Sequence, residues 1–74
     1  MEEWKKCRKR EPEYEFREPK AETVWRGRPA ELIQTNNGAY YAIIGEDFVV
    51  RELGVLPKVI PKGRFTAEFQ IVGE

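Results

Sequence analysis

The sequence has no histidine and no serine, and its 74 residues include one cysteine, Cys7, and one aspartate, Asp47. General acid–base and nucleophilic catalysis need such groups placed together. Lysine and arginine near Cys7 favour a lowered thiol pKa, but no histidine is present to act as its base. We also expect the segment around Cys7 to lack the packing that fixes a catalytic geometry. We therefore predict that the chain is not an enzyme and has no catalytic residue.

The sequence also lacks the ligand sets of common metal and phosphate sites. One cysteine and one aspartate are too few for a zinc site, and Glu46-Asp47 does not have the spaced oxygen ligands of a calcium loop. Gly27, Gly45 and Gly63 each stand alone, so none belongs to a glycine-rich phosphate loop. We predict no metal and no cofactor, and we interpret Glu46-Asp47 as a turn.

Neither excess charge nor a long apolar run is present. Thirteen Lys and Arg balance thirteen Asp and Glu, which removes any whole-molecule argument for binding nucleic acid or a membrane surface. A single cysteine cannot form an intramolecular disulfide, and no stretch has the apolar length of a signal sequence or a membrane span. We expect a soluble protein of a reducing cytoplasm, with no membrane partner. At this length it is one domain, either a marginal monomer or a homo-oligomer.

The densest apolar stretch and the clearest turn lie between residues 32 and 53. Two runs of strand-forming residues, 32–35 and 39–44, flank Asn36-Asn37-Gly38, whose residues tolerate positive φ. This pattern predicts a β-hairpin. Gly45-Glu46-Asp47 then interrupts the apolar run, and Phe48-Val49-Val50 resumes it as a third strand. Three consecutive short strands predict a meander.

Further strand-like stretches occur on both sides of this meander. They are residues 13–17, 21–26, 55–61 and 64–72. Two prolines restrict 55–61 to an edge strand or an extended connector, whereas 64–72 has the cleanest alternation. The sequence therefore predicts a mostly β fold, a small antiparallel barrel or rolled meander sheet of five to seven short strands. Residues 1–12 are expected to form a charged N-terminal arm or a short helix, and residues 13–74 a single small β domain.

The alternation in 64–72 also predicts a core. Phe65, Phe69 and Ile71 share one face of the expected strand, with Ala67 between them. Further core residues are expected from the tryptophan strand and the central meander. These are Trp25, Ile43 and Val49.

Two features of the sequence are candidate binding sites. Trp4 lies among five cations within residues 5–10, a combination able to contact phosphates and stack on a base. These candidate nucleic-acid-binding residues are Trp4, Lys5, Lys6, Arg8, Lys9 and Arg10. A solvated segment partly neutralised by neighbouring glutamates is the alternative that we favour. The second feature is Tyr40-Tyr41, whose rings should point to opposite faces of a strand. An exposed tyrosine is a common protein-binding anchor, although a ring covering the end of a barrel is an equal alternative.

The order of these elements resembles that of an uncharacterised family of small phage and prophage proteins. That family has a basic start with a proline, an acidic strand leading to a tryptophan, a Gly-Asp-aromatic-Ile segment and a closing proline with a Phe-x-x-x-aromatic strand. The matching residues here are 8–12, 22–25, 45–50, 51–54, Pro61, Phe65 and Phe69. Glu46 is an insertion, Ile44 replaces a proline, and Phe69 replaces a tyrosine. The resemblance brings no catalytic residues.

The resemblance, the small size and the missing chemistry together lead to a hypothesis of function. We expect a non-enzymatic, phage-encoded binding protein that engages a host protein or protein complex in the host cytoplasm, as an inhibitor of an anti-phage defence such as a CRISPR effector. A nucleic-acid-binding small β-barrel that uses the basic N-terminal arm is the second hypothesis. A self-associating phage structural component that uses the edge at 55–61 is the third.

Overall fold

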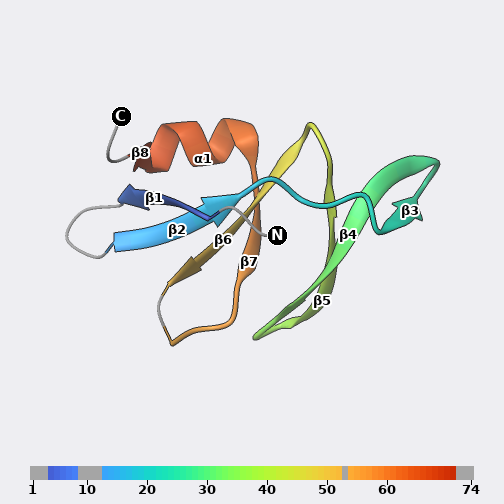
Figure 1. Cartoon of the computed structure of the whole chain (residues 1–74), viewed down its shortest axis with the longest axis horizontal. Coiled ribbons are helices and arrows are strands. Elements are labelled where there is room, and N and C mark those ends of the chain that lie inside the picture. The colour runs from blue at the N-terminus through green and yellow to red at the C-terminus, as the bar shows by residue number, and fades with distance from the viewer. Residues whose placement is uncertain (1–3, 9–12, 53, 72–74) are drawn as a thin grey trace.

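The structure is a computed structural model, and it describes residues 4–8, 13–52 and 54–71. Within these residues the chain forms eight strands and one short helix (Figure 1). In chain order the elements are β1 (Lys5–Arg8), β2 (Glu13–Arg17), β3 (Thr23–Trp25), β4 (Arg28–Thr35), β5 (Gly38–Ile43), β6 (Asp47–Glu52), β7 (Lys58–Pro61), α1 (Lys62–Glu68) and β8 (Gln70–Ile71).

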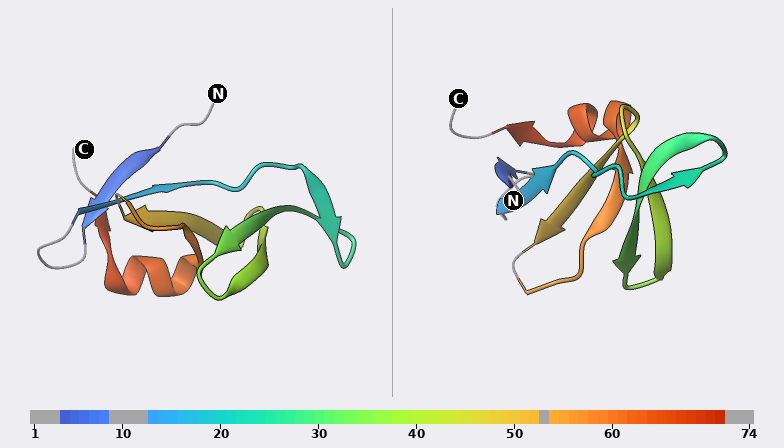
Figure 2. Two further views of the ribbon diagram at one scale, coloured as in Figure 1. Left: turned by 90° about the horizontal axis from the view of Figure 1, so that it is seen from below. Right: turned by 45° about the vertical axis from the view of Figure 1, so that its right-hand side comes forward.

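The strands form two antiparallel sheets. The larger sheet has the order β7-β6-β2-β1-β8, and the smaller sheet is the meander β3-β4-β5. The hairpin of β4 and β5 lies beside β7 and away from β1 (Figures 1 and 2). The predicted mostly β fold is confirmed, in its meander form and not as a closed barrel.

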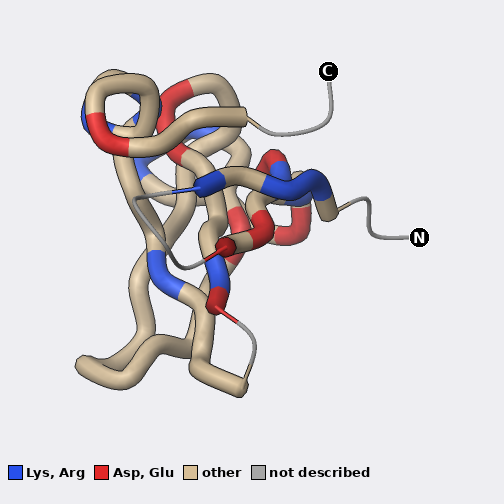
Figure 3. The backbone as a smooth tube through the Cα atoms, turned by 90° about the vertical axis from the view of Figure 1, so that its left-hand side faces the viewer, with Lys and Arg blue, Asp and Glu red and all other residues tan. Residues whose placement is uncertain are grey.

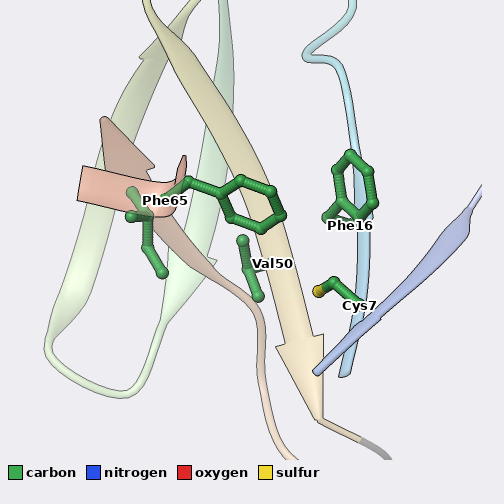
Figure 4. Close-up of a cluster of buried hydrophobic side chains, with 5 residues drawn as sticks. Cys7, Phe16, Val50 and Phe65 are labelled. Atoms are coloured by element: carbon green, nitrogen blue, oxygen red, sulfur yellow. The ribbon is translucent and has the colours of Figure 1, made fainter. Parts of the chain in front are cut away.

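One hydrophobic core lies between the larger sheet and α1. It contains Cys7, Phe16, Val50, Ile60 and Phe65, all of which are buried (Figure 4). The ring centroids of Phe16 and Phe65 are 4.7 Å apart, close enough for the ring contact to add to the area buried. Tyr14, Phe48 and Phe69 pack around this cluster.

A second core lies on the opposite face of the larger sheet. Val49 directly precedes Val50 in β6, and neighbouring side chains of a strand point to opposite faces of its sheet. Val49 is fully buried against Ile33 and Ala42 of the hairpin, with Val59 and Trp4 packed beside them. The larger sheet is therefore covered by α1 on one face and by the hairpin on the other.

A buried ion pair also joins the two sheets. Arg17 on β2 donates two hydrogen bonds to the carboxylate of Glu31 on β4, at 2.7 and 2.8 Å. The backbone N–H of Lys20 donates a third to the same carboxylate at 2.9 Å. The hydrogen bonds from Arg17 lower the pKa of Glu31, and they outweigh the opposing effect of burial. Glu31 is therefore ionised at neutral pH despite its burial.

The N-terminal prediction is wrong for the residues that the structure describes. Lys5–Arg8 form strand β1, not a charged arm or a short helix, and they pair in register with β2. Cys7 is fully buried in the first core, so the expectation of an unpacked segment is also wrong. Cys7 is the one apolar residue of β1 and the one that is buried, between the exposed Lys6 and Arg8.

The predicted strand over residues 64–72 is also wrong. Lys62–Glu68 form helix α1, which begins directly after Pro61, and of the described residues in this range only Gln70–Ile71 form a strand. Phe65 and Phe69 are four residues apart, a spacing that suits one face of a helix as well as one face of a strand. Phe65 is buried and Phe69 half-buried, as predicted for core residues, but Ile71 is 48% exposed.

Other predictions are confirmed or corrected in detail. Asn36-Asn37 form the turn between β4 and β5, and Gly38 has φ of +116°. Residues 13–17 form a strand as predicted, and the proline-containing stretch supplies the edge strand β7. Trp25 belongs to neither core and is 40% exposed, whereas Ile43 and Val49 are buried.

We expect Phe65→Ala to lower the free energy of unfolding by about 3–5 kcal/mol, because it removes the aromatic ring at the centre of the first core. Urea denaturation of the variant and the parent measures this. Ile71→Ala is the control, since the exposed Ile71 side chain should contribute less than about 1 kcal/mol. Equal losses in the two variants would contradict this assignment of the core.

Removing one partner of the buried ion pair should be costly. We expect Glu31→Leu to destabilise by about 3–5 kcal/mol, because it leaves Arg17 buried without its carboxylate. The double variant Arg17→Met/Glu31→Leu should recover part of this loss, and chemical denaturation of the single and double variants measures the difference. A double variant no more stable than Glu31→Leu would contradict this account.

The same pair predicts a pH dependence. The folded-state pKa of Glu31 lies below its ordinary value of 4.5, so its contribution to stability is complete above that value. It is lost as the pH falls through the lower, folded-state pKa. Melting temperatures of the parent should therefore fall at acidic pH more steeply than those of the double variant. If the melting temperatures of the two proteins fell equally with pH, the ion pair would not be the cause of the loss of stability in acid.

Candidate protein-binding site

An open groove of about 780 Å³ lies between β5 and the segment that runs from residue 55 to Pro61. Trp25 and the tip of the β4–β5 hairpin form one wall, and the turn after β6 with strand β7 forms the other. The lining residues are Trp25, Thr35, Asn36, Asn37, Ala39, Tyr40, Tyr41, Asp47, Val55, Leu56, Pro57, Lys58, Val59 and Pro61. We call this the β5–β7 groove.

Its walls come largely from two uncharged stretches of a highly charged chain. Charged residues make up 35% of the sequence, yet residues 32–45 and 54–57 contain none. Figure 3 shows this distribution of charge. The lower end of the molecule is tan, that is, without charged residues, and the blue and red positions lie above it. The apolar side chains on this surface are exposed: Tyr40 by 48%, Leu56 by 47% and Val55 by 43%.

The aromatic residues of the groove come from two strands. Trp25 on β3 stacks on Tyr41 of β5, with ring centroids 4.6 Å apart and ring planes 13° from parallel. Tyr41 pairs with the exposed Leu32 across the ladder, whereas Tyr40 pairs with the buried Ile33. The two tyrosines therefore point to opposite faces, as predicted. Both line the groove, because it extends around the edge of β5.

Trp25 is the groove residue that sequence reasoning misplaced. Its size and its position in a strand suggested a core residue, but β3 is a short, fully exposed strand at the edge of the smaller sheet. The guanidinium carbon of Arg26 lies 5.3 Å from the centre of the Trp25 ring. This indole is thus held between a tyrosine ring and a cation, with part of its surface open to solvent.

The predicted nucleic-acid-binding residues that the structure describes, Trp4, Lys5, Lys6 and Arg8, do not form a separate arm. Trp4 is half-buried beside the second core, and the guanidinium carbons of Arg51 and Arg17 lie 3.8 and 5.0 Å from its ring centre. Arg8 donates a hydrogen bond to Glu13 at 3.1 Å.

A glutamate faces one of the two described lysines of this segment. Lys6 lies opposite Glu15 across the ladder, and Lys5 lies opposite Phe16. Both lysines are exposed. Lys9 and Arg10 lie outside the described residues. The described positive charges of β1 are thus interleaved with glutamates from β2.

Cys7 is placed where it cannot act as a nucleophile. The side chain is fully buried, and burial raises the pKa of its thiol to about 11. Burial is the cause of this shift, contrary to the expectation from the sequence that neighbouring cations lower the pKa of the thiol. The thiolate is the reactive form, so this sulfur is inert in the folded chain.

Two further observations concern the described residues alone. No three His, Cys, Asp or Glu side chains come together in this part of the chain as a possible metal site. Within the same residues, no helix has both the length and the apolar character needed to cross a membrane.

No family model, curated protein or solved structure matches this chain.

We expect the Cys7 thiol to resist a disulfide reagent at pH 8 in the folded protein and to react within seconds in denaturant. The reasons are its complete burial and its pKa of about 11. Absorbance of the released thiolate follows the reaction. Rapid labelling without denaturant, in a parent that still melts cooperatively, would contradict this placement of Cys7.

Proposed function

We propose that this chain is a non-enzymatic protein-binding module and that its partner docks on the β5–β7 groove. One observation carries this proposal: four of the seven exposed large apolar side chains in the described part of the chain, Trp25, Tyr40, Val55 and Leu56, line one groove. Contiguous exposed apolar surface on a small protein marks an interaction site. We assign Tyr40 and Leu56 as two side chains that anchor the partner.

The composition of the groove suits a protein partner. Tyrosine and tryptophan provide much of the binding energy at protein interfaces, because a large ring is desolvated at a small cost in conformational entropy. Trp25 is already fixed by its stacking on Tyr41, so little ordering is needed when it is covered. Asn36, Asn37 and Lys58 provide a polar rim.

Direct binding of nucleic acid has weaker support. A phosphate-binding surface needs cations whose charge is not cancelled locally. Arg8 pairs with Glu13, and Arg51 with Glu15 at 2.8 Å. The Trp4 ring already contacts two guanidinium groups, which compete with a base for its faces. These observations favour the protein-binding proposal over the nucleic-acid one.

The third hypothesis, self-association through residues 55–61, also has less support. Two prolines on β7 and its approach limit the backbone hydrogen bonds that this edge offers. For the identity of the partner we retain the class that the sequence resemblance implies, a host protein complex such as a bacterial defence effector. That part of the proposal rests on the resemblance alone.

The proposal predicts that Tyr40→Ala and Leu56→Ala each weaken partner binding by about tenfold or more, because each removes an exposed apolar anchor. Val24→Ala is the matched control. Val24 is 64% exposed but does not line the groove, so its loss should have little effect. The measurement is affinity purification from a bacterial lysate with and without nuclease, followed by titration of the recovered partner.

Two results would contradict the proposal. The first is a partner that disappears on nuclease treatment and binds with a steep salt dependence, about −0.7 to −0.9 in log affinity per phosphate contact. The second is equal binding by the parent, Tyr40→Ala and Leu56→Ala. Circular dichroism and melting temperatures must show that all three variants are folded.

A further inference from the structure

The edge of β5 that borders the groove has backbone hydrogen-bonding groups without partners. In an antiparallel ladder, alternate residues direct both N–H and C=O toward the same neighbour. The N–H of Ile44, directly after β5, donates to the carbonyl of Pro29 on β4 at 3.1 Å. Counting back by twos, Ala42 and Tyr40 also face β4. Ala39, Tyr41 and Ile43 therefore face away from it.

The chain itself closes one end of this edge. The N–H of Ile43 donates to the Asp47 carboxylate at 2.8 Å, and its carbonyl accepts the N–H of Glu46 at 3.0 Å. These bonds confirm the direction assigned to the odd-numbered residues. Within the described part of the chain, no corresponding partner is found for the outward groups of Ala39 and Tyr41.

The opposite wall of the groove is different. The N–H of Lys62 donates to the carbonyl of Glu46 on the β6 side at 2.9 Å, so Ile60 faces β6 while Val59 and Pro61 face outward. Proline has no N–H to donate. Proline is a common means of preventing an edge strand from pairing. The edge of β7 is therefore partly blocked, whereas that of β5 is open.

The charges near the groove indicate the character of its ligand. The described cations elsewhere are largely paired with glutamates, including Arg28 with Glu46 and Lys62 with Glu18. No described carboxylate pairs with Lys58 on the groove wall or with Arg26 beside Trp25. Asp47, the acid that lines the groove, accepts the N–H of Ile43. Lys58 and Arg26 together outnumber the single acid Asp47, so the three groups have a net positive charge that acidic residues in the ligand complement.

Resting on the proposed function, we propose that an extended segment of the partner protein adds as a fourth strand to β3-β4-β5 at the free edge of β5. The segment exchanges backbone hydrogen bonds with Ala39 and Tyr41, a mode known as β-augmentation. It places apolar side chains against Trp25 and Leu56, and it carries acidic residues that meet Lys58 and Arg26.

A second copy of the chain is the other possible occupant. A two-fold axis through Tyr40 would pair Ala39 of each copy with Tyr41 of the other and satisfy the same backbone groups. That arrangement brings the same net positive charge of both copies, Lys58 and Arg26 against Asp47, to one interface. Charge complementarity therefore favours an acidic, apolar segment from a different protein.

The experiment uses a displayed library of random 12-residue peptides, selected on the immobilised full chain. The enriched peptides are synthesised and titrated by fluorescence anisotropy against the parent, Ala39→Pro and Ala39→Val. Proline removes the outward N–H of residue 39 and leaves the ladder to β4 intact, whereas valine keeps that N–H. We expect enrichment of acidic, apolar-alternating peptides, at least tenfold weaker binding by Ala39→Pro, and binding by Ala39→Val within threefold of the parent.

A ligand-side test covers the case in which Ala39→Pro does not fold. N-methylation of alternate amides in the selected peptide should weaken binding at least tenfold in one register and little in the other. Amide hydrogen exchange should show new protection at Ala39 and Tyr41 when the peptide is bound.

Three outcomes would overturn the inference. Equal peptide binding by the proline and valine variants, or insensitivity to N-methylation in both registers, would show that the groove is filled without strand addition. Dimerisation of the parent that Ala39→Pro abolishes would identify a second copy as the occupant. Failure to select any peptide would exclude an extended segment. In the first and last cases, loss of partner binding in Tyr40→Ala would still support the proposed function.

Discussion

The buried ion pair between Arg17 and Glu31 joins the two sheets, and the groove depends on how those sheets are held. Arg17 comes from β2 in the larger sheet and Glu31 from β4 in the smaller one, and each side chain is less than one-tenth exposed. Breaking such a pair costs about 3–5 kcal/mol, a large fraction of the roughly 5–15 kcal/mol by which domains are stable. The pair thus joins the sheet that contains β7 to the sheet that contains β5, the two strands that border the groove.

The central hairpin and its neighbours were predictable because several local signals agree. Asn36-Asn37-Gly38 lies between two strand-forming runs, and the turn has glycine at a positive φ that other residues adopt at a cost. Alternating charge and aromatic residues over 13–17 gave β2 its bounds. The uncharged surface and the two tyrosines were also visible in the sequence. At these positions the residues of the turn and of the strand themselves determine the local backbone, so the structure agrees with the sequence pattern.

The errors occur where one pattern fits two structures or where a long-range contact decides the outcome. Phe65 and Phe69 suit both a helix and a strand, and packing of Phe65 against Phe16 of β2 favours the helix. Cys7 was assigned to an unpacked segment because five cations surround it in sequence, but pairing with β2 buries it. Trp25 is the largest apolar residue of β3, and yet it lies outside both cores. No local property indicates that β3 ends at an exposed edge beside Tyr41.

Strand β6 contributes Val50 to the core beneath α1 and Val49 to the core beneath the hairpin. Neither core can lose this strand and remain closed, so the two layers have no independent existence. The chain should accordingly gain and lose its structure in a single cooperative step, with no stable half-folded species. The open edge of β5 therefore exists only while both sheets are folded, so a ligand that binds this edge as proposed would bind the folded chain and not the unfolded one.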